Sequence, residues 1–121
     1  MTYFVLLILL YNVLLHTKEE WATRNIYQLM TDRFGAEGPL PHCLNLNDYC
    51  GGTFKGITGR LDYIQSMGFN AIWISPIVEN TKLGYHGYWS KDITKINERF
   101  GTEQDLVELV TECHKRGNFD Y

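Results

Sequence analysis

Three aromatic residues and a histidine surround one glycine in the stretch YHGYW, residues 85–89. In a protein core, the imidazole and both phenol hydroxyls would each need a buried hydrogen-bond partner. Beside a cleft, the same rings could face a ligand, because Gly87 has no Cβ and lets the backbone turn sharply between them. Two interpretations remain open from these five residues: a wall that faces a ligand, and an aromatic cluster that only closes one end of the fold.

Two cysteines, Cys43 and Cys50, bracket a short loop that is rich in asparagine. Such closely spaced cysteines in a secreted protein favour a short disulfide. A zinc site that combines them with His42 and His114 matches no standard ligand spacing. The spacing therefore favours the disulfide over the metal site.

The chain begins with an apolar run, YFVLLILLYNVLLH, which is too short for a membrane span of about 20 residues. We interpret residues 1–17 as a secretory signal peptide, with residues 18–121 as the folded part, and expect a secreted protein. No Lys or Arg precedes the run and no small-x-small cleavage site follows it. An uncleaved anchor or an N-terminal core helix therefore remains the alternative.

The composition limits the possible partners. With 121 residues, of which 45% are hydrophobic, the chain can form one ordinary globular domain at most. The formal net charge is −3 and no basic stripe is present, so we expect no nucleic-acid partner. We also expect a monomer, with no membrane partner beyond the leader.

Two strands are predicted from the apolar pattern. Residues 25–31 alternate in a strand-like way up to Asp32, and residues 69–75 form a nearly continuous apolar run that Pro76 stops. A strand without polar alternation is usually covered on both faces, as in parallel sheets. A long loop, residues 33–55, separates the first strand from the next element.

Two helices complete the pattern. Residues 57–67 place apolar side chains at helical spacing, and Gly68 follows as a C-terminal cap. Thr102 and Asp105 have the spacing of a capping pair for a helix that runs to about Lys115. On that helix Cys113 continues an apolar face, which predicts a buried thiol outside the disulfide.

The order strand, helix, strand, helix predicts an α/β fold with parallel strands. A doubly wound nucleotide binder would need a G-x-G-x-x-G turn after the first strand, and none is present. Long loops after the strands are typical of a (β/α)₈ TIM barrel, which builds its site from those loops. We therefore expect Asp32, the 43–50 loop and residues 85–89 at the same end of the sheet.

Four stretches carry a resemblance to a known family: IYQLMTDRF (26–34), YCGGTFKGI (49–57), LDYIQSMGFNAIWISPI (61–77) and YHGYWSKDI (85–93). In this order they resemble the N-terminal part of fungal-type secreted α-amylases, which belong to the α-amylase family of glycoside hydrolases. The resemblance covers roughly residues 21–117. It implies the N-terminal βαβα portion of a (β/α)₈ barrel, endo-hydrolysis of α-1,4-glucosidic bonds in starch with retention, and calcium as structural ion.

The resemblance also implies roles for individual residues. Tyr88 and Trp89 would pack on a glucose ring, His86 would hydrogen-bond a sugar hydroxyl, and Tyr85 belongs to the same sugar-lining stretch. Asn47 stands where the fungal enzymes commonly have a glutamine that reaches the substrate, and it is one methylene shorter.

Two further features follow from the resemblance. Cys43 and Cys50 would form the family's first disulfide, in a loop one residue tighter than usual. Asp32 and Arg33 would form a structural charged pair below the loops.

Retaining hydrolysis needs two carboxyl groups about 5 Å apart. No Asp or Glu of this sequence can be matched to the family's catalytic carboxylates or to its calcium ligands. We therefore expect the 121 residues alone to hydrolyse no starch. The alternative function is a non-catalytic, truncated or degenerate product that binds glucan weakly at most. Two βα units should also leave the apolar faces of Ile72 and Ile74 half uncovered and the strand edges unpaired, which favours aggregation.

Overall fold

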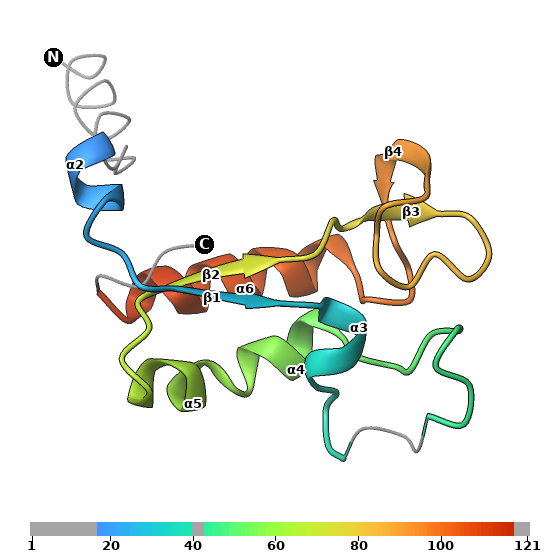
Figure 1. Cartoon of the computed structure of the whole chain (residues 1–121), viewed down its shortest axis with the longest axis horizontal. Coiled ribbons are helices and arrows are strands. Elements are labelled where there is room, and N and C mark those ends of the chain that lie inside the picture. Colours follow the sequence, from blue (N-terminus) through green and yellow to red (C-terminus); the bar gives the residue numbers. More distant parts are fainter. Residues whose placement is uncertain (1–16, 40–42, 118–121) are drawn as a thin grey trace, which may run out of the picture.

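The computed structural model describes residues 17–39 and 43–117, so the predicted signal peptide lies outside the described residues up to position 16. Strands β1 (Ile26–Leu29) and β2 (Ala71–Ile74) are parallel and pair from Ile26↔Ala71 to Leu29↔Ile74 (Figure 1). The predicted parallel pair is confirmed, with each strand shorter than expected. β1 stops early because Met30 already caps the short helix α3 (Thr31–Phe34).

The predicted helix 57–67 is two helices, α4 (Phe54–Thr58) and α5 (Leu61–Ser66). α4 begins earlier than expected because the Thr53 hydroxyl accepts the Gly56 N–H at its N-terminus. The break falls at Gly59 and Arg60. Glycine is a poor helix former, and the backbone dihedral angles of Arg60 lie outside the helical region.

The second predicted helix is confirmed as α6 (Glu103–Lys115), including its capping box. The Thr102 hydroxyl accepts the Asp105 N–H, and the Asp105 carboxylate accepts the Thr102 N–H in return. Cys113 is fully buried, as its helical spacing predicts.

The helices α4, α5 and α6 cover one face of the β1–β2 sheet (Figure 1). Ile72 and Ile74 are 4% and 9% exposed, so the expectation that their faces are half uncovered is wrong. Their side chains point toward the helices and join the main core. The other core members are Leu29, Phe54, Ile57, Leu61, Ile64, Phe100, Leu109 and Cys113.

The opposite face of the sheet is the uncovered one among the described residues. Trp73 is 59% exposed and Ile26 is 44% exposed, and together with Trp21 they border an apolar groove of about 350 Å³. Trp21 ends the short helix α2 (Lys18–Trp21), which buries none of its residues. No helix in the described part of the chain is long and apolar enough to cross a membrane.

A second, antiparallel sheet stands where the sequence predicts only a loop. β3 (Val78–Asn80) pairs with β4 (Ser90–Ile96), with register shifts on both sides of Glu79. The sequence pattern misses this hairpin because β3 has three residues and the pairing is irregular. The connection between these strands carries residues 85–89.

Candidate functional site

The two loops singled out by the sequence lie at the same end of the β1–β2 sheet. Figure 1 shows the 43–50 loop and the β3–β4 hairpin beyond the carboxyl ends of β1 and β2. Ligand sites of parallel α/β folds form at this end, because the loops that follow the strands converge there. The expected placement is confirmed.

The loop at residues 43–50, hereafter the disulfide loop, is closed by a bond between Cys43 and Cys50 with a Cα–Cα distance of 5.1 Å. The expected disulfide is therefore present, and it removes both thiolates that a zinc site would need. Within the loop, the Asn45 side chain accepts the Asn47 N–H at 3.1 Å, which is an Asx turn. The Asn47 side chain is exposed.

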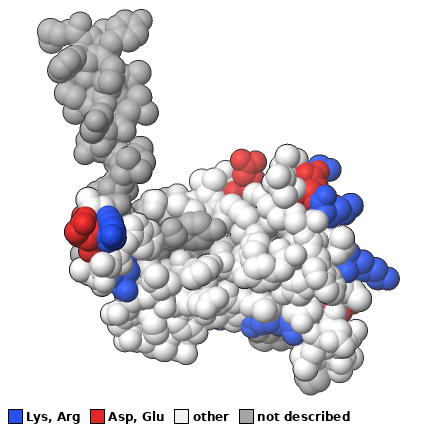
Figure 2. Space-filling view, turned by 45° about the horizontal axis from the view of Figure 1, so that its top comes forward, with Lys and Arg blue, Asp and Glu red and all other residues white. Residues whose placement is uncertain are grey.

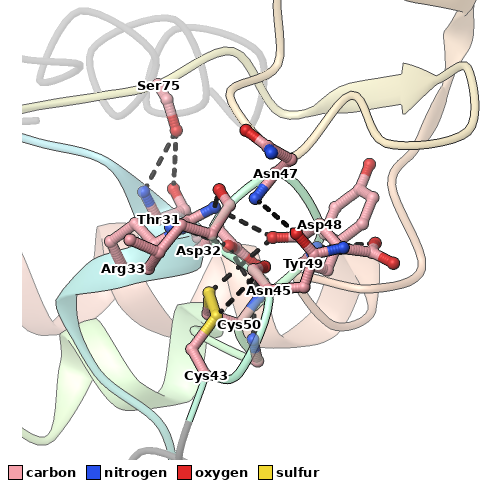
Figure 3. Close-up of polar contacts among 12 residues, drawn as sticks. Thr31, Asp32, Arg33, Cys43, Asn45, Asn47, Asp48, Tyr49, Cys50 and Ser75 are labelled. Atoms are coloured by element: carbon pink, nitrogen blue, oxygen red, sulfur yellow. Dashed lines mark hydrogen bonds and ion pairs between the residues drawn. A yellow bond between two sulfur atoms is a disulfide. The ribbon is translucent and has the colours of Figure 1, made fainter.

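Asp32 anchors this loop to the short helix α3, which follows β1 (Figure 3). Its carboxylate is 1% exposed and accepts the backbone N–H groups of Cys50 at 2.8 Å and Gly51 at 3.3 Å. The guanidinium of Arg33 donates its Nε–H to the same carboxylate at 2.8 Å. The expected structural pair of Asp32 and Arg33 is confirmed, because these donors compensate a charge that would be costly to bury alone.

The four ring residues of 85–89 are packed around His86. Its ring centroid lies 5.2 Å from that of Tyr85, 5.9 Å from that of Tyr88 and 4.7 Å from that of Trp89. The imidazole is stacked on Tyr88 and meets Trp89 edge-on. Tyr88 and Trp89 nevertheless remain 66% and 55% exposed. The stretch is therefore a surface cluster of rings and not part of the core.

The hydrogen bonding of His86 fixes its tautomer. The backbone N–H of Tyr88 donates to His86 Nδ1 at 3.0 Å, so Nδ1 is the acceptor of the neutral ring and Nε2 carries the proton. Nε2 makes no hydrogen bond within residues 17–39 and 43–117. It is thus available to donate to a ligand.

Two features hold the turn of the hairpin in place. Gly87 adopts φ +87°, and a Cβ at this position would collide with the Pro76 carbonyl oxygen. The Asn80 side chain accepts the Trp89 N–H at 2.7 Å and donates to the Val78 carbonyl at 2.7 Å. The sequence indicates the sharp turn at the glycine but not the role of Asn80, which depends on a hairpin that no local pattern predicts.

The charged groups that follow the ring cluster are engaged in structural contacts. The hydroxyl and backbone N–H of Thr94 lower the pKa of Asp92, so this carboxylate stays ionised and is a poor proton donor. The hydrogen bond and charge of Glu79 raise the pKa of Lys91. The hairpin therefore offers rings and hydrogen-bond donors rather than an acid/base pair.

A cleft of about 420 Å³ opens between the disulfide loop and the hairpin. Its walls include Tyr49, whose hydroxyl accepts the Asn97 side-chain N–H at 2.9 Å, and Arg99, which lies over the Tyr49 ring. The ring cluster of 85–89 stands outside this cleft, on the exposed surface of the hairpin.

On the face shown in Figure 2, acidic and basic side chains lie near one another in small groups. Among the described residues, no group of three or more His, Cys, Asp or Glu side chains is arranged to hold a metal ion.

Comparison with known proteins identifies the relatives of this chain. The family of the α-amylase catalytic domain matches residues 18–118. α-Amylase 3 of Schizosaccharomyces pombe is 49% identical over 130 aligned residues, which cover 95% of this chain and 23% of the relative. α-Amylase 2 of Schwanniomyces occidentalis is 55% identical over 79% of this chain and 21% of its own length.

Solved structures give the same result. The α-amylase from Malbranchea cinnamomea superimposes with a TM-score of 0.77 at 44% identity, over 84% of this chain and 23% of that protein. The α-amylase from Geobacillus thermoleovorans, solved with acarbose, gives a TM-score of 0.71 at 46% identity, over 79% of this chain and 21% of that protein. The chain thus spans roughly a fifth of the length of these relatives.

Proposed function

The chain belongs to the α-amylase family of glycoside hydrolases, and from this premise we propose that residues 85–89 and Asn47 form one wall of an α-glucan-binding cleft in a starch-hydrolysing enzyme. This proposed cleft is separate from the one beside Tyr49 and Arg99, which none of these residues lines. One observation supports the proposal most strongly. His86, Tyr88 and Trp89 pack into an ordered cluster, yet Tyr88 and Trp89 remain 66% and 55% exposed. Ordered rings that stay exposed favour a binding surface over a core.

The chemistry of the cluster suits a sugar. Pyranose rings have apolar C–H faces, which pack on aromatic surfaces such as those of Tyr88 and Trp89. The Nε2–H of His86 donates to a sugar hydroxyl beside these faces, and the Tyr88 backbone keeps it in the donor tautomer. Asn47 contributes a side-chain amide from the disulfide loop.

The proposed activity of the whole enzyme is endo-hydrolysis of α-1,4-glucosidic bonds with retention, by analogy with the relatives. Retention requires a nucleophile and an acid/base carboxyl about 5 Å apart. None of the acidic residues in this sequence matches these two carboxyl groups. The role proposed for residues 85–89 and Asn47 is therefore substrate binding. The chain alone is expected to release no reducing sugar from soluble starch.

Calcium is the structural ion that the family resemblance implies. The described residues do not fit it, because no group of three or more His, Cys, Asp or Glu side chains converges within 17–39 and 43–117. No part of the binding proposal depends on the ion.

We further propose that residues 1–17 act as a signal peptide and that the protein is secreted as a monomer, with starch-type glucans as its partners. The disulfide between Cys43 and Cys50 supports passage through an oxidising compartment.

Tryptophan fluorescence tests the binding proposal with a matched pair of variants. The chain has three tryptophans, and Trp73 and Trp89 are similarly exposed, at 59% and 55%. Maltopentaose should quench the wild type and Trp73→Phe, whereas Trp89→Phe should lose the response. Equal responses of the two variants would contradict the placement of the site.

A further inference from the structure

The Arg33 side chain contacts three separate parts of the molecule. Its Nε–H donates to Asp32 at 2.8 Å, and its Nη2 donates to the backbone carbonyls of Leu46 and Asp48, each at 2.9 Å. The carbon at the centre of its guanidinium lies 4.0 Å from the centroid of the Tyr85 ring. Arg33 therefore joins its own helix α3, the disulfide loop and the first residue of the ring cluster.

This set of contacts requires a guanidinium. The planar group donates hydrogen bonds along its edges while its flat face remains available to cover an aromatic ring. A lysine ammonium is a point charge, so it could keep the ion pair with Asp32 but not the paired carbonyl contacts together with the ring contact. The charge is already balanced by Asp32, which means that Arg33 is not offered to a ligand as a free cation.

The two carbonyls that Arg33 binds belong to the residues on either side of Asn47. Leu46 and Asp48 are thereby fixed in the backbone, although the Leu46 side chain itself is 68% exposed. On its other side, Arg33 covers Tyr85, whose ring meets that of His86. One side chain thus sets the position of Asn47 relative to the ring cluster.

We propose that Arg33 is a positioning residue of the glucan site, which holds Asn47 and the Tyr85 end of the ring cluster at a fixed separation. This inference rests on the function proposed above. Arg33 acts through these neighbours and does not itself contact the sugar. Its role therefore differs from the purely structural pairing with Asp32 that the sequence indicates.

A matched control variant is available in the same chain. Arg33 donates to two backbone carbonyls, and Arg60 likewise donates to three, those of Ala36, Gly56 and Gly38, none of which lies in the disulfide loop or the ring cluster. Arg33→Lys and Arg60→Lys should both lower the thermal stability, since each loses carbonyl contacts. Only Arg33→Lys should weaken the binding of maltopentaose, by about fivefold or more, as expected for a lost hydrogen bond in the site.

Coupling to Asn47 separates positioning from general stability. In the wild type, Asn47→Ala should weaken maltopentaose binding by about fivefold. In the Arg33→Lys background the same change should have little further effect, because Asn47 is already displaced. In the Arg60→Lys background it should keep its full effect. A second readout is the rate at which dithiothreitol reduces the disulfide, which should rise in Arg33→Lys and not in Arg60→Lys.

Each outcome has one meaning. If the wild type binds maltopentaose and Arg33→Lys binds it equally well, or if Asn47→Ala has its full effect in the Arg33→Lys background, the positioning role is wrong and the glucan site stands. Equal reduction rates in Arg33→Lys and Arg60→Lys would also overturn the positioning role. If the wild type itself does not bind, the proposed function fails first.

Discussion

The carboxylate of Asp32, in the short helix α3 that follows the first strand, accepts the backbone N–H of Cys50 at 2.8 Å. This contact connects the closing residue of the disulfide loop to the β1–β2 sheet through a group that is 1% exposed. Two constraints therefore meet at Cys50: the covalent bond to Cys43 closes the loop, and the buried carboxylate of Asp32 fixes the closed loop to the rest of the fold.

Replacing Asp32 by asparagine should lower the free energy of unfolding by about 3 kcal/mol. The amide keeps one acceptor oxygen but turns an N–H group toward the N–H donors of Cys50 and Gly51 and leaves the Arg33 charge uncompensated. Urea unfolding at neutral pH measures the change. Asp62→Asn is the control, because the Asp62 side chain is 86% exposed and its pair with Arg116 should contribute less than about 1 kcal/mol. Equal losses in the two variants would contradict the anchoring role.

Gly87→Ala should disrupt the ring cluster and also lower the free energy of unfolding. Alanine at φ +87° carries backbone strain of about 1–3 kcal/mol, and its Cβ would also collide with Pro76. Gly68→Ala separates the two effects, because Gly68 has φ +89° and open space where a Cβ would be added. Both variants should lose stability in urea, but only Gly87→Ala should lose glucan binding. Normal binding by Gly87→Ala would show that the turn does not position the rings.

The capping box of α6 predicts a dependence of stability on acid pH. The backbone N–H of Thr102, followed by its hydroxyl and by Lys55, lowers the pKa of Asp105. A carboxyl whose pKa is lower in the folded state stabilises the fold above its unfolded pKa, near 3.9, and loses this contribution as the pH falls through the folded value. Asp105→Asn should therefore reduce the loss of stability on acidification below about pH 4, as measured by urea unfolding across pH. The control is Glu19→Gln, on the exposed helix α2, which should leave the loss of stability on acidification unchanged.

The sequence predicts the sheet and its last helix because their signals are local. The apolar run before Pro76 and the capping pair of Thr102 and Asp105 each act within a few residues of the chain. The pattern does not indicate the break between α4 and α5, because Ile57, Leu61 and Ile64 keep helical spacing across it and all three are buried. Met67 continues that spacing but is 44% exposed, since α5 has already ended at Ser66.

The candidate site is only partly predictable from sequence, for a physical reason. The rings of 85–89, Gly87 and the two cysteines are visible because their residue types are distinctive. Asn80 is not, and Arg33 is visible only as the partner of Asp32, because their further contacts, with Trp89 and Tyr85, depend on the hairpin. A β-hairpin with a three-residue first strand leaves too weak a pattern to predict those contacts.

The central claim, that residues 85–89 and Asn47 form a wall for an α-glucan, is tested most directly by calorimetric titration of the purified, disulfide-bonded chain with two pentasaccharides. Maltopentaose and cellopentaose have the same number of glucose units and differ in the α-1,4 or β-1,4 linkage. The account predicts measurable heat of binding for maltopentaose, much weaker binding of cellopentaose, and loss of the maltopentaose signal in Trp89→Ala but not in Trp73→Ala. Equal binding of the two sugars, or an undiminished maltopentaose signal in Trp89→Ala, would contradict it.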